Sequence, residues 1–173
     1  MKRLAMFLIL LLMIAVFVFA FSGKSGDVLR LHVLANSDAA ADVSVKQEIV
    51  ELVNAYIAEN FTGESLDETL EFIKSNIEEI KNLILNYLSK AGLSYGVDIT
   101  LKTDDFPSRS YGSVYFPSGE YSALVITLGE GEGDNWWCVL YPRLCYGKDA
   151  GSVGIIYRSR LVEAYRKIFK ESK

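Results

Sequence analysis

The chain is poor in the residues that bind metals and phosphates. Its 173 residues include one histidine and two cysteines, which are too few ligands for a tetrahedral zinc site. Its glycine-rich segment, Gly129–Asp134, carries three acidic residues and lacks the lysine and the glycine spacing of a phosphate loop. The ligand order of a helix–loop–helix calcium site is absent as well. We therefore expect no metal site and no cofactor, and we interpret Gly129–Asp134 as a flexible acidic hairpin loop.

Basic residues are also scarce. The chain has 18 lysines and arginines against 22 acidic residues, and two of the basic residues, Lys2 and Arg3, lie in an otherwise apolar N-terminal stretch. Without residues 1–20, the chain carries 16 basic and 22 acidic residues, a net charge of −6. A nucleic-acid-binding protein needs a basic face, and a protein held to anionic lipid needs a polybasic patch. The composition argues against both partners.

The N-terminal segment is the one long apolar run. Lys2 and Arg3 precede eighteen uncharged, almost wholly apolar residues, Leu4–Phe21. This pattern is typical of a secretory signal peptide or an N-terminal anchor, and its length, close to the minimum for roughly 30 Å of hydrocarbon, leaves cleavage and retention both open. We expect the rest of the chain outside the cytoplasmic membrane, attached to it only through this segment. The predicted organisation is a signal or anchor over 1–21, a linker over 22–27 and a single α+β domain over 28–173.

The first half of the domain has one strand and two helices. Val28–Ala35 alternates in polarity, as a strand does. Asn36–Asp38 offers N-cap chemistry for a first helix whose apolar residues recur at helical spacing until Asn60–Gly63 interrupts it. A capping-box pattern at Ser65 opens a second helix, and Gly92 ends it. The short connection between the two helices predicts a helical hairpin.

The second half changes to the period of strands. Pro117–Glu120 is typical of a hairpin turn between two of them, and Ile155–Phe169 is predicted to form a basic amphipathic C-terminal helix. The full prediction is an α+β fold with one N-terminal strand, a helical hairpin, about four mostly antiparallel strands and a C-terminal helix. The four strands are predicted over Val97–Thr103, Ser113–Phe116, Tyr121–Leu128 and Asn135–Leu140.

An enzymatic interpretation has to use the single histidine. A Cys138–His32 pair, oriented by Asn36 or Asp38, would match the nucleophile–base logic of a secreted hydrolase acting on peptide or cell wall. Cys138 lies in an apolar, strand-like run, however, and not at a helix N-terminus that would activate its thiol. We therefore predict no catalytic residue and a structural role for His32, Asn36 and Asp38. Cys138 and Cys145 are either a disulfide or two buried thiols.

Aromatic and arginine residues gather between Phe106 and Trp137. These residue types anchor protein interfaces, and core packing does not readily explain why an arginine and polar loop residues lie among the aromatics. We therefore predict a surface that binds a partner protein. Its candidate residues are Arg109, Tyr111, Glu130, Asn135, Trp136 and Trp137.

Four segments of the chain, in their order, resemble the stage II sporulation protein R family. They are Leu29–Asp38, Phe106–Gly112, Pro117–Leu124 and Gly129–Cys145. The helical hairpin matches in pattern more than in residues, and Arg143 stands where a second proline is common in the family.

The resemblance implies a signalling protein of endospore-forming bacteria rather than an enzyme. Such a protein is made in the forespore, secreted across the cytoplasmic membrane and released between the forespore and mother-cell membranes. Its implied partner is a membrane-embedded aspartic-type protease of the mother cell, which cleaves an inactive sigma-factor precursor. The resemblance supplies no catalytic residues. A passive module of the cell wall or membrane is a third interpretation, besides the signal and the Cys–His hydrolase.

Overall fold

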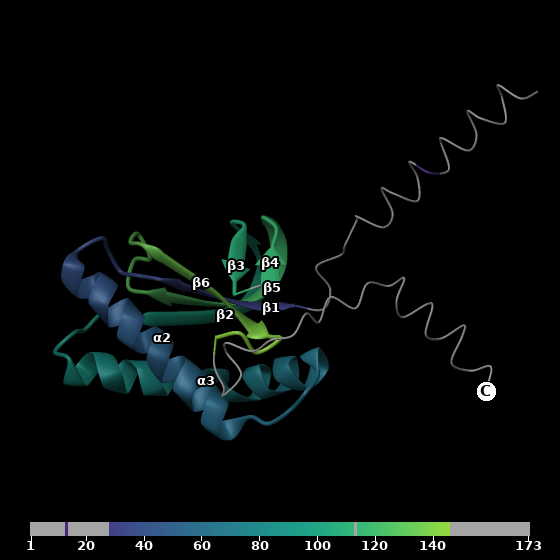
Figure 1. Ribbon diagram of the computed structural model, residues 1–173. Helices are drawn as coiled ribbons and strands as arrows, with labels where there is room; N and C mark the ends of the chain where they lie inside the picture. Colours follow the sequence, from purple (N-terminus) through teal and green to yellow (C-terminus); the bar gives the residue numbers. More distant parts are fainter. Residues whose placement is uncertain (1–12, 14–27, 113, 146–173) are drawn as a thin grey trace, which may run out of the picture.

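The fold is built on a four-stranded sheet with two helices on one side and a short β-ribbon on the other (Figure 1). The computed structural model describes Met13, residues 28–112 and residues 114–145. The predicted leader over 1–21, apart from Met13, and the predicted helix over Ile155–Phe169 lie outside the described residues. The elements are β1 (Leu29–Leu34), α2 (Ala40–Asn60), α3 (Leu66–Lys90), β2 (Val97–Phe106), β3 (Arg109–Tyr111), β4 (Val114–Phe116), β5 (Gly119–Leu128) and β6 (Asn135–Tyr141).

The first strand of the chain lies in the middle of the sheet. The strand order is β2-β5-β1-β6, with β1 parallel to β5 and antiparallel to β6. The segment Gly129–Asp134 therefore passes over the end of β1 to connect two strands that do not pair. Its prediction as a hairpin loop is wrong. The turn at Pro117–Glu120 does not close a hairpin either, because β4 pairs with β3 and β5 pairs with β2.

The two helices form the predicted helical hairpin, and their first turns are built differently. The capping box of α3 is confirmed: the Ser65 hydroxyl accepts from the Glu68 N–H at 3.2 Å, and the Glu68 carboxylate accepts from the Ser65 N–H at 3.0 Å. The Glu64 N–H donates to the same carboxylate at 2.8 Å, and together with the Ser65 hydroxyl and N–H it holds the pKa of Glu68 below its usual value.

The predicted N-cap of α2 is wrong, because Ala39 occupies that position and no side chain caps it. The Asn36 amide and the Ser37 hydroxyl instead donate to the Asp42 carboxylate, at 2.8 and 2.6 Å. Asn36 and Ser37 thus bond to a side chain in the first turn of α2 and do not cap the free N–H groups of the helix. The two hydrogen bonds hold the pKa of Asp42 below its usual value.

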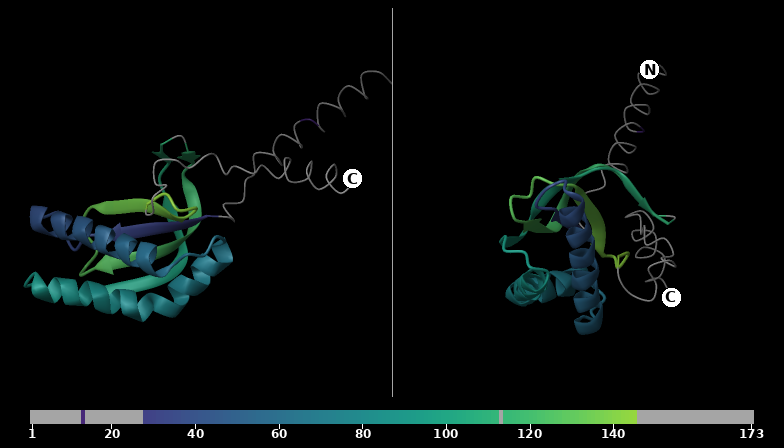
Figure 2. Two further views of the ribbon diagram at one scale, coloured as in Figure 1. Left: turned by 60° about the horizontal axis from the view of Figure 1, so that its bottom comes forward. Right: turned by 90° about the vertical axis from the view of Figure 1, so that its left-hand side faces the viewer.

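Strand alternation gives the sheet two different faces. Figure 2 shows α2 and α3 together on one side, and we call this side the helix face. The other side, partly covered by β3 and β4, we call the ribbon face. The helix face buries a mainly aliphatic core that includes Leu31, Val53, Ile80, Ile84, Leu124 and Ile126. The ribbon face buries a smaller core of Phe106, Val114, Phe116, Tyr121, Ala123, Val125, Val139 and Leu144.

The segment Gly129–Asp134 is held closely against the start of α2. The N–H groups of Glu130 and Glu132 donate to the side-chain and main-chain oxygens of Asn36, at 3.1 and 3.3 Å. A Cβ atom at Gly133 would lie 2.2 Å from the Ser37 carbonyl oxygen, so this close approach requires glycine. The segment therefore serves as a bonded crossover between β5 and β6. None of the helices in the described part combines the length and hydropathy that a membrane span needs.

Candidate functional site

Four of the six predicted partner-binding residues lie together on the ribbon face. Arg109 and Tyr111 come from β3, and Asn135 and Trp137 come from β6. The Arg109 guanidinium lies over the Trp137 ring, 4.9 Å from its centre, and the Tyr111 hydroxyl donates to the Trp137 carbonyl at 2.9 Å. We call Arg109, Tyr111, Asn135 and Trp137 the ribbon surface. Arg109 is exposed, whereas the other three are half-buried.

His32 lies beneath this surface and connects two strands that are not neighbours. Its Nδ1 is 2.6 Å from the Asp104 carboxylate, and its Nε2 is 2.7 Å from the Asn135 amide oxygen. The ring also stacks on Trp137, with the two ring centres 5.7 Å apart. His32 therefore fixes the side chains of both Asn135 and Trp137.

Arg30 supports the same surface from deeper in the ribbon face. Its side chain is fully buried, and its Nε donates to the Cys138 carbonyl at 3.0 Å. Its Nη2 donates to the Tyr111 hydroxyl at 3.3 Å, so the residue links β1 to β3. Four aromatic rings lie within 4.4–5.8 Å of the guanidinium carbon, those of Phe106, Tyr111, Phe116 and Tyr121. Burial lowers the pKa of Arg30 and raises that of Tyr111.

Two predicted residues, Glu130 and Trp136, lie apart from the ribbon surface. Trp136 packs against the core of the helix face, because side chains alternate along β6. Glu130 is exposed in the crossover at the end of β1, where its N–H bonds to Asn36. The structure thus reduces the candidate surface to four of the six predicted residues.

Sequence reasoning missed Arg30, Asp104 and Phe106 as supports of the surface. Alternation along β1 puts Arg30 on the same face as His32, so the sequence pattern of this strand could have identified Arg30. Asp104 contacts His32 although β5 lies between their strands, so only the three-dimensional pairing reveals it. The residues predicted to orient His32 lie elsewhere: Asn36 bonds to Asp42, and Asp38 is exposed.

The structure separates the two residues of the hydrolase hypothesis. His32 pairs with Trp137 in the register of β1 and β6, and Cys138 pairs with Leu31. Because successive side chains alternate, Cys138 faces the helices whereas His32 faces the ribbon. Cys138 also forms a disulfide with Cys145, and a bridged sulfur is not a nucleophile. Among the residues that the structure describes, no three His, Cys, Asp or Glu side chains are grouped to hold a metal ion.

Comparison with known proteins gives one consistent result. The family model described as stage II sporulation protein R matches residues 25–150. Stage II sporulation protein R of Bacillus subtilis strain 168 is 39% identical over 121 residues, which cover 68% of this chain and 53% of that protein. The chain thus spans about half the length of this curated relative. No solved structure matches the chain.

Proposed function

Because the chain belongs to the stage II sporulation protein R family, and so has a role in sporulation, we propose that it is an exported protein signal. It activates a membrane-embedded aspartic-type protease, which then cleaves the inactive precursor of a mother-cell sigma factor. Residues 1–21 carry it from the forespore across the cytoplasmic membrane, into the space between the forespore and mother-cell membranes. The chain contributes binding and no catalytic residue to this pathway.

The observation that supports the proposal is the construction of the ribbon surface. An exposed arginine lies on a half-buried tryptophan, and His32 and Tyr111 hold that tryptophan in place. Arginine and tryptophan are the residues that most often dominate binding energy at protein interfaces. Residues fixed before binding lose little conformational entropy when a partner docks. The ribbon surface therefore suits recognition of a folded protein.

Activation requires only that the ribbon surface bind the active state of the protease more tightly than the inactive state. Moving a two-state equilibrium from 1:99 to 99:1 takes a difference of about 5.5 kcal/mol. Each dominant interface residue contributes on the order of 2 kcal/mol or more, so two or three anchors suffice. Arg109 and Trp137 supply two of them.

The proposal is tested by co-expressing the exported chain with the protease and the sigma precursor and measuring precursor cleavage. We expect Arg109→Ala combined with Trp137→Ala to reduce cleavage at least about tenfold, since the variant loses two interface anchors. Lys90→Ala, an exposed basic residue at the end of α3, is the matched control and is expected to keep full cleavage.

Export is tested in the same assay. Deletion of residues 1–21 is expected to abolish activation, because the domain then stays in the cytoplasm. The signalling proposal fails if the intact chain does not raise cleavage. The assignment of the ribbon surface fails if the double variant, shown to be folded by circular dichroism, signals as well as Lys90→Ala.

A further inference from the structure

The two edge strands of the sheet, β6 and β2, differ in whether another segment bonds to their outward groups. At the β6 edge, the Val139 carbonyl accepts from the Leu144 N–H at 3.4 Å, and the Val139 N–H donates to the Cys145 sulfur at 2.8 Å. The disulfide loop between Cys138 and Cys145 therefore covers this edge at Val139. At the β2 edge, by contrast, no hydrogen bond leads from Val97–Phe106 to a further backbone segment within the described residues. An uncovered edge of ten residues is a template for another strand.

The register shows which groups of β2 face outward. The Gly129 N–H donates to the Gly96 carbonyl, so this pair is hydrogen-bonded across β2 and β5. Hydrogen-bonded and non-bonded pairs alternate along an antiparallel ladder. The N–H and C=O groups of Ile99, Leu101, Thr103 and Asp105 therefore point away from β5 and toward the free edge.

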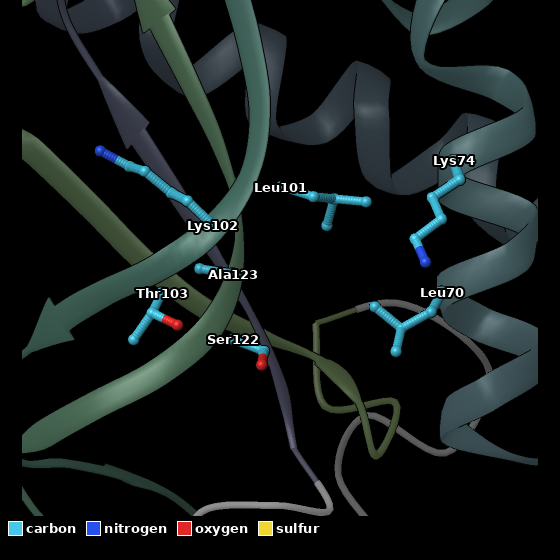
Figure 3. Close-up of a pocket in the computed structure, with 7 residues that line it drawn as sticks. All are labelled: Leu70, Lys74, Leu101, Lys102, Thr103, Ser122 and Ala123. Atoms are coloured by element: carbon cyan, nitrogen blue, oxygen red, sulfur yellow. The ribbon is translucent and has the colours of Figure 1, made fainter.

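A pocket of about 240 Å³ lies next to these groups, between α3 and the edge of the sheet. Figure 3 shows Leu70 and Lys74 extending from α3 toward the strands and Leu101 extending toward the helix, whereas Lys102 points away. Thr103, Ser122 and Ala123 complete the lining. The pocket thus combines aliphatic walls with an ammonium group and two hydroxyl groups, and its lining contains no acidic residue.

We propose that the β2 edge and this pocket bind an extended segment of a partner protein that carries an acidic side chain. The segment pairs with β2 as a fifth strand, through the outward groups of Ile99–Asp105, and its carboxylate enters the pocket to meet Lys74. Main-chain hydrogen bonds supply affinity in this mode of binding, and a side-chain pocket supplies specificity. Lys74 is exposed and forms no ion pair within the described part of the chain, so its charge is available.

Charge argues against the two other occupants. Residues 146–173 of this chain carry seven basic and three acidic residues, a net charge of +4, and do not complement a pocket that presents the Lys74 ammonium. A second copy would pair β2 with β2, and that strand holds Asp98, Asp104 and Asp105 against one lysine. Like charges on directly paired strands destabilise the pairing. The charges favour a segment of a different protein that places one carboxylate at Lys74 and has no acidic residue directly opposite Asp98, Asp104 or Asp105.

The test needs neither the protease nor the sigma precursor, so its failure is distinguishable from failure of the proposed function. The full chain, isotope-labelled in a mild non-ionic detergent, is titrated with a library of acetylated and amidated peptides, Thr-Val-Xaa-Glu-Xaa-Val-Thr. A matched library has lysine at the central position. We expect the glutamate peptides to bind with a dissociation constant below about 1 mM and the lysine peptides at least about tenfold more weakly. The amide resonances that shift are those of Ile99, Leu101, Thr103 and Asp105.

A charge exchange identifies Lys74 as the recognition residue. Lys74→Glu should weaken the glutamate peptides at least about tenfold and strengthen the lysine peptides, because the sign of the pocket is reversed. Lys90→Glu makes the same change on the same helix, outside the pocket lining, and should alter neither affinity beyond about twofold. Retention of both affinities in Lys74→Glu, or absence of binding by both libraries, overturns the proposal.

The competing occupants are resolved with the same resonances. Deletion of residues 146–173 should leave the amide shifts of β2 unchanged, and dilution of the chain should do so too. Shifts on deletion would show that the chain's own tail occupies the edge, and shifts on dilution would show pairing between copies. Either result overturns the assignment of a foreign acidic segment.

Discussion

Within the described residues, each face of the sheet has one fully buried basic side chain, Lys46 or Arg30, and the two are stabilised by different chemistry. On the helix face, Lys46 of α2 is fully buried, and its ammonium lies 2.6 Å from the Asp134 carboxylate. On the ribbon face, Arg30 has no carboxylate partner among the described residues and is held by aromatic rings, one carbonyl and one hydroxyl. Lys46 fixes the path of the main chain, because Asp134 ends the crossover to β6. Arg30 fixes side chains, because Tyr111 and its ring neighbours carry the ribbon surface.

The strongest test of this comparison is Arg30→Ala. Loss of a fully buried side chain among four rings leaves a cavity and removes the donors to Cys138 and Tyr111, so we expect a loss of about 4 kcal/mol in the free energy of unfolding. Urea unfolding followed by tryptophan fluorescence measures it. Arg30→Lys keeps the charge without the planar guanidinium and should lose about half as much. Wild-type stability of Arg30→Lys would show that charge alone is required at this position.

The helix face should respond as an ordinary aliphatic core. Ile80→Ala deletes a fully buried side chain of α3 and should cost about 3 kcal/mol, whereas Ile80→Val should cost about 1 kcal/mol. Wherever these variants are folded, precursor cleavage should match that of the wild type, because Ile80 does not belong to the ribbon surface. A loss of signalling in a folded Ile80→Val would break the functional division between the two faces.

The ion pair on the helix face makes stability depend on pH. The hydrogen bond from Lys46 holds the pKa of Asp134 below its usual value, so the pair stabilises the fold above the unfolded pKa, near 3.9. That contribution is lost as the pH falls through the lower pKa of the folded state. Because Asp134 is exposed, Asp134→Asn should cost only about 1.5 kcal/mol at pH 7, and the difference should shrink below about pH 4. A difference that is constant from pH 7 to pH 3 would contradict this account.

The smallest expected effect on stability is at the ribbon surface itself. Arg109 is exposed, and a cation–π contact at an exposed site contributes about 0.5–1 kcal/mol. Arg109→Ala should therefore lower the free energy of unfolding by less than about 1 kcal/mol while it reduces signalling. Differential scanning calorimetry and the cleavage assay measure the two effects. A larger loss of stability would show that Arg109 supports the core, and it would contradict the proposal that Arg109 acts mainly in partner binding.

Local sequence signals predicted the elements better than their arrangement. The capping box and Gly92 bounded α3 closely, and the strand predicted over Val28–Ala35 contains β1. The strand predicted to end at Thr103 continues to Phe106, because Asp104 and Asp105 also pair with β5. Turn chemistry describes only neighbours in sequence. It therefore missed the parallel pairing of β1 with β5.

The residues of the candidate site were also predicted only as far as local sequence patterns allow. Composition alone brought Arg109 and Trp137 into one hypothesis, and the structure places them in contact. Glu130 and Trp136 were grouped with them by proximity in sequence, although alternation along β6 turns Trp136 to the other face. The contact between His32 and Asp104 depends on strands that are not adjacent. A pattern read along one chain does not contain that information.

The central position of β1 has a consequence for how the protein folds. Its neighbours in the sheet lie about a hundred residues later in the chain, since Leu29 is opposite Ser122 on one side and Tyr141 on the other. Contacts so distant in sequence make folding slow, on the order of milliseconds to seconds. During synthesis, β1 has to wait for its first partner until β5 has been made, and for its second until β6 has been made. A chain interrupted before Asn135 leaves one edge of this apolar strand unpaired and open to aggregation, so only nearly complete chains become native.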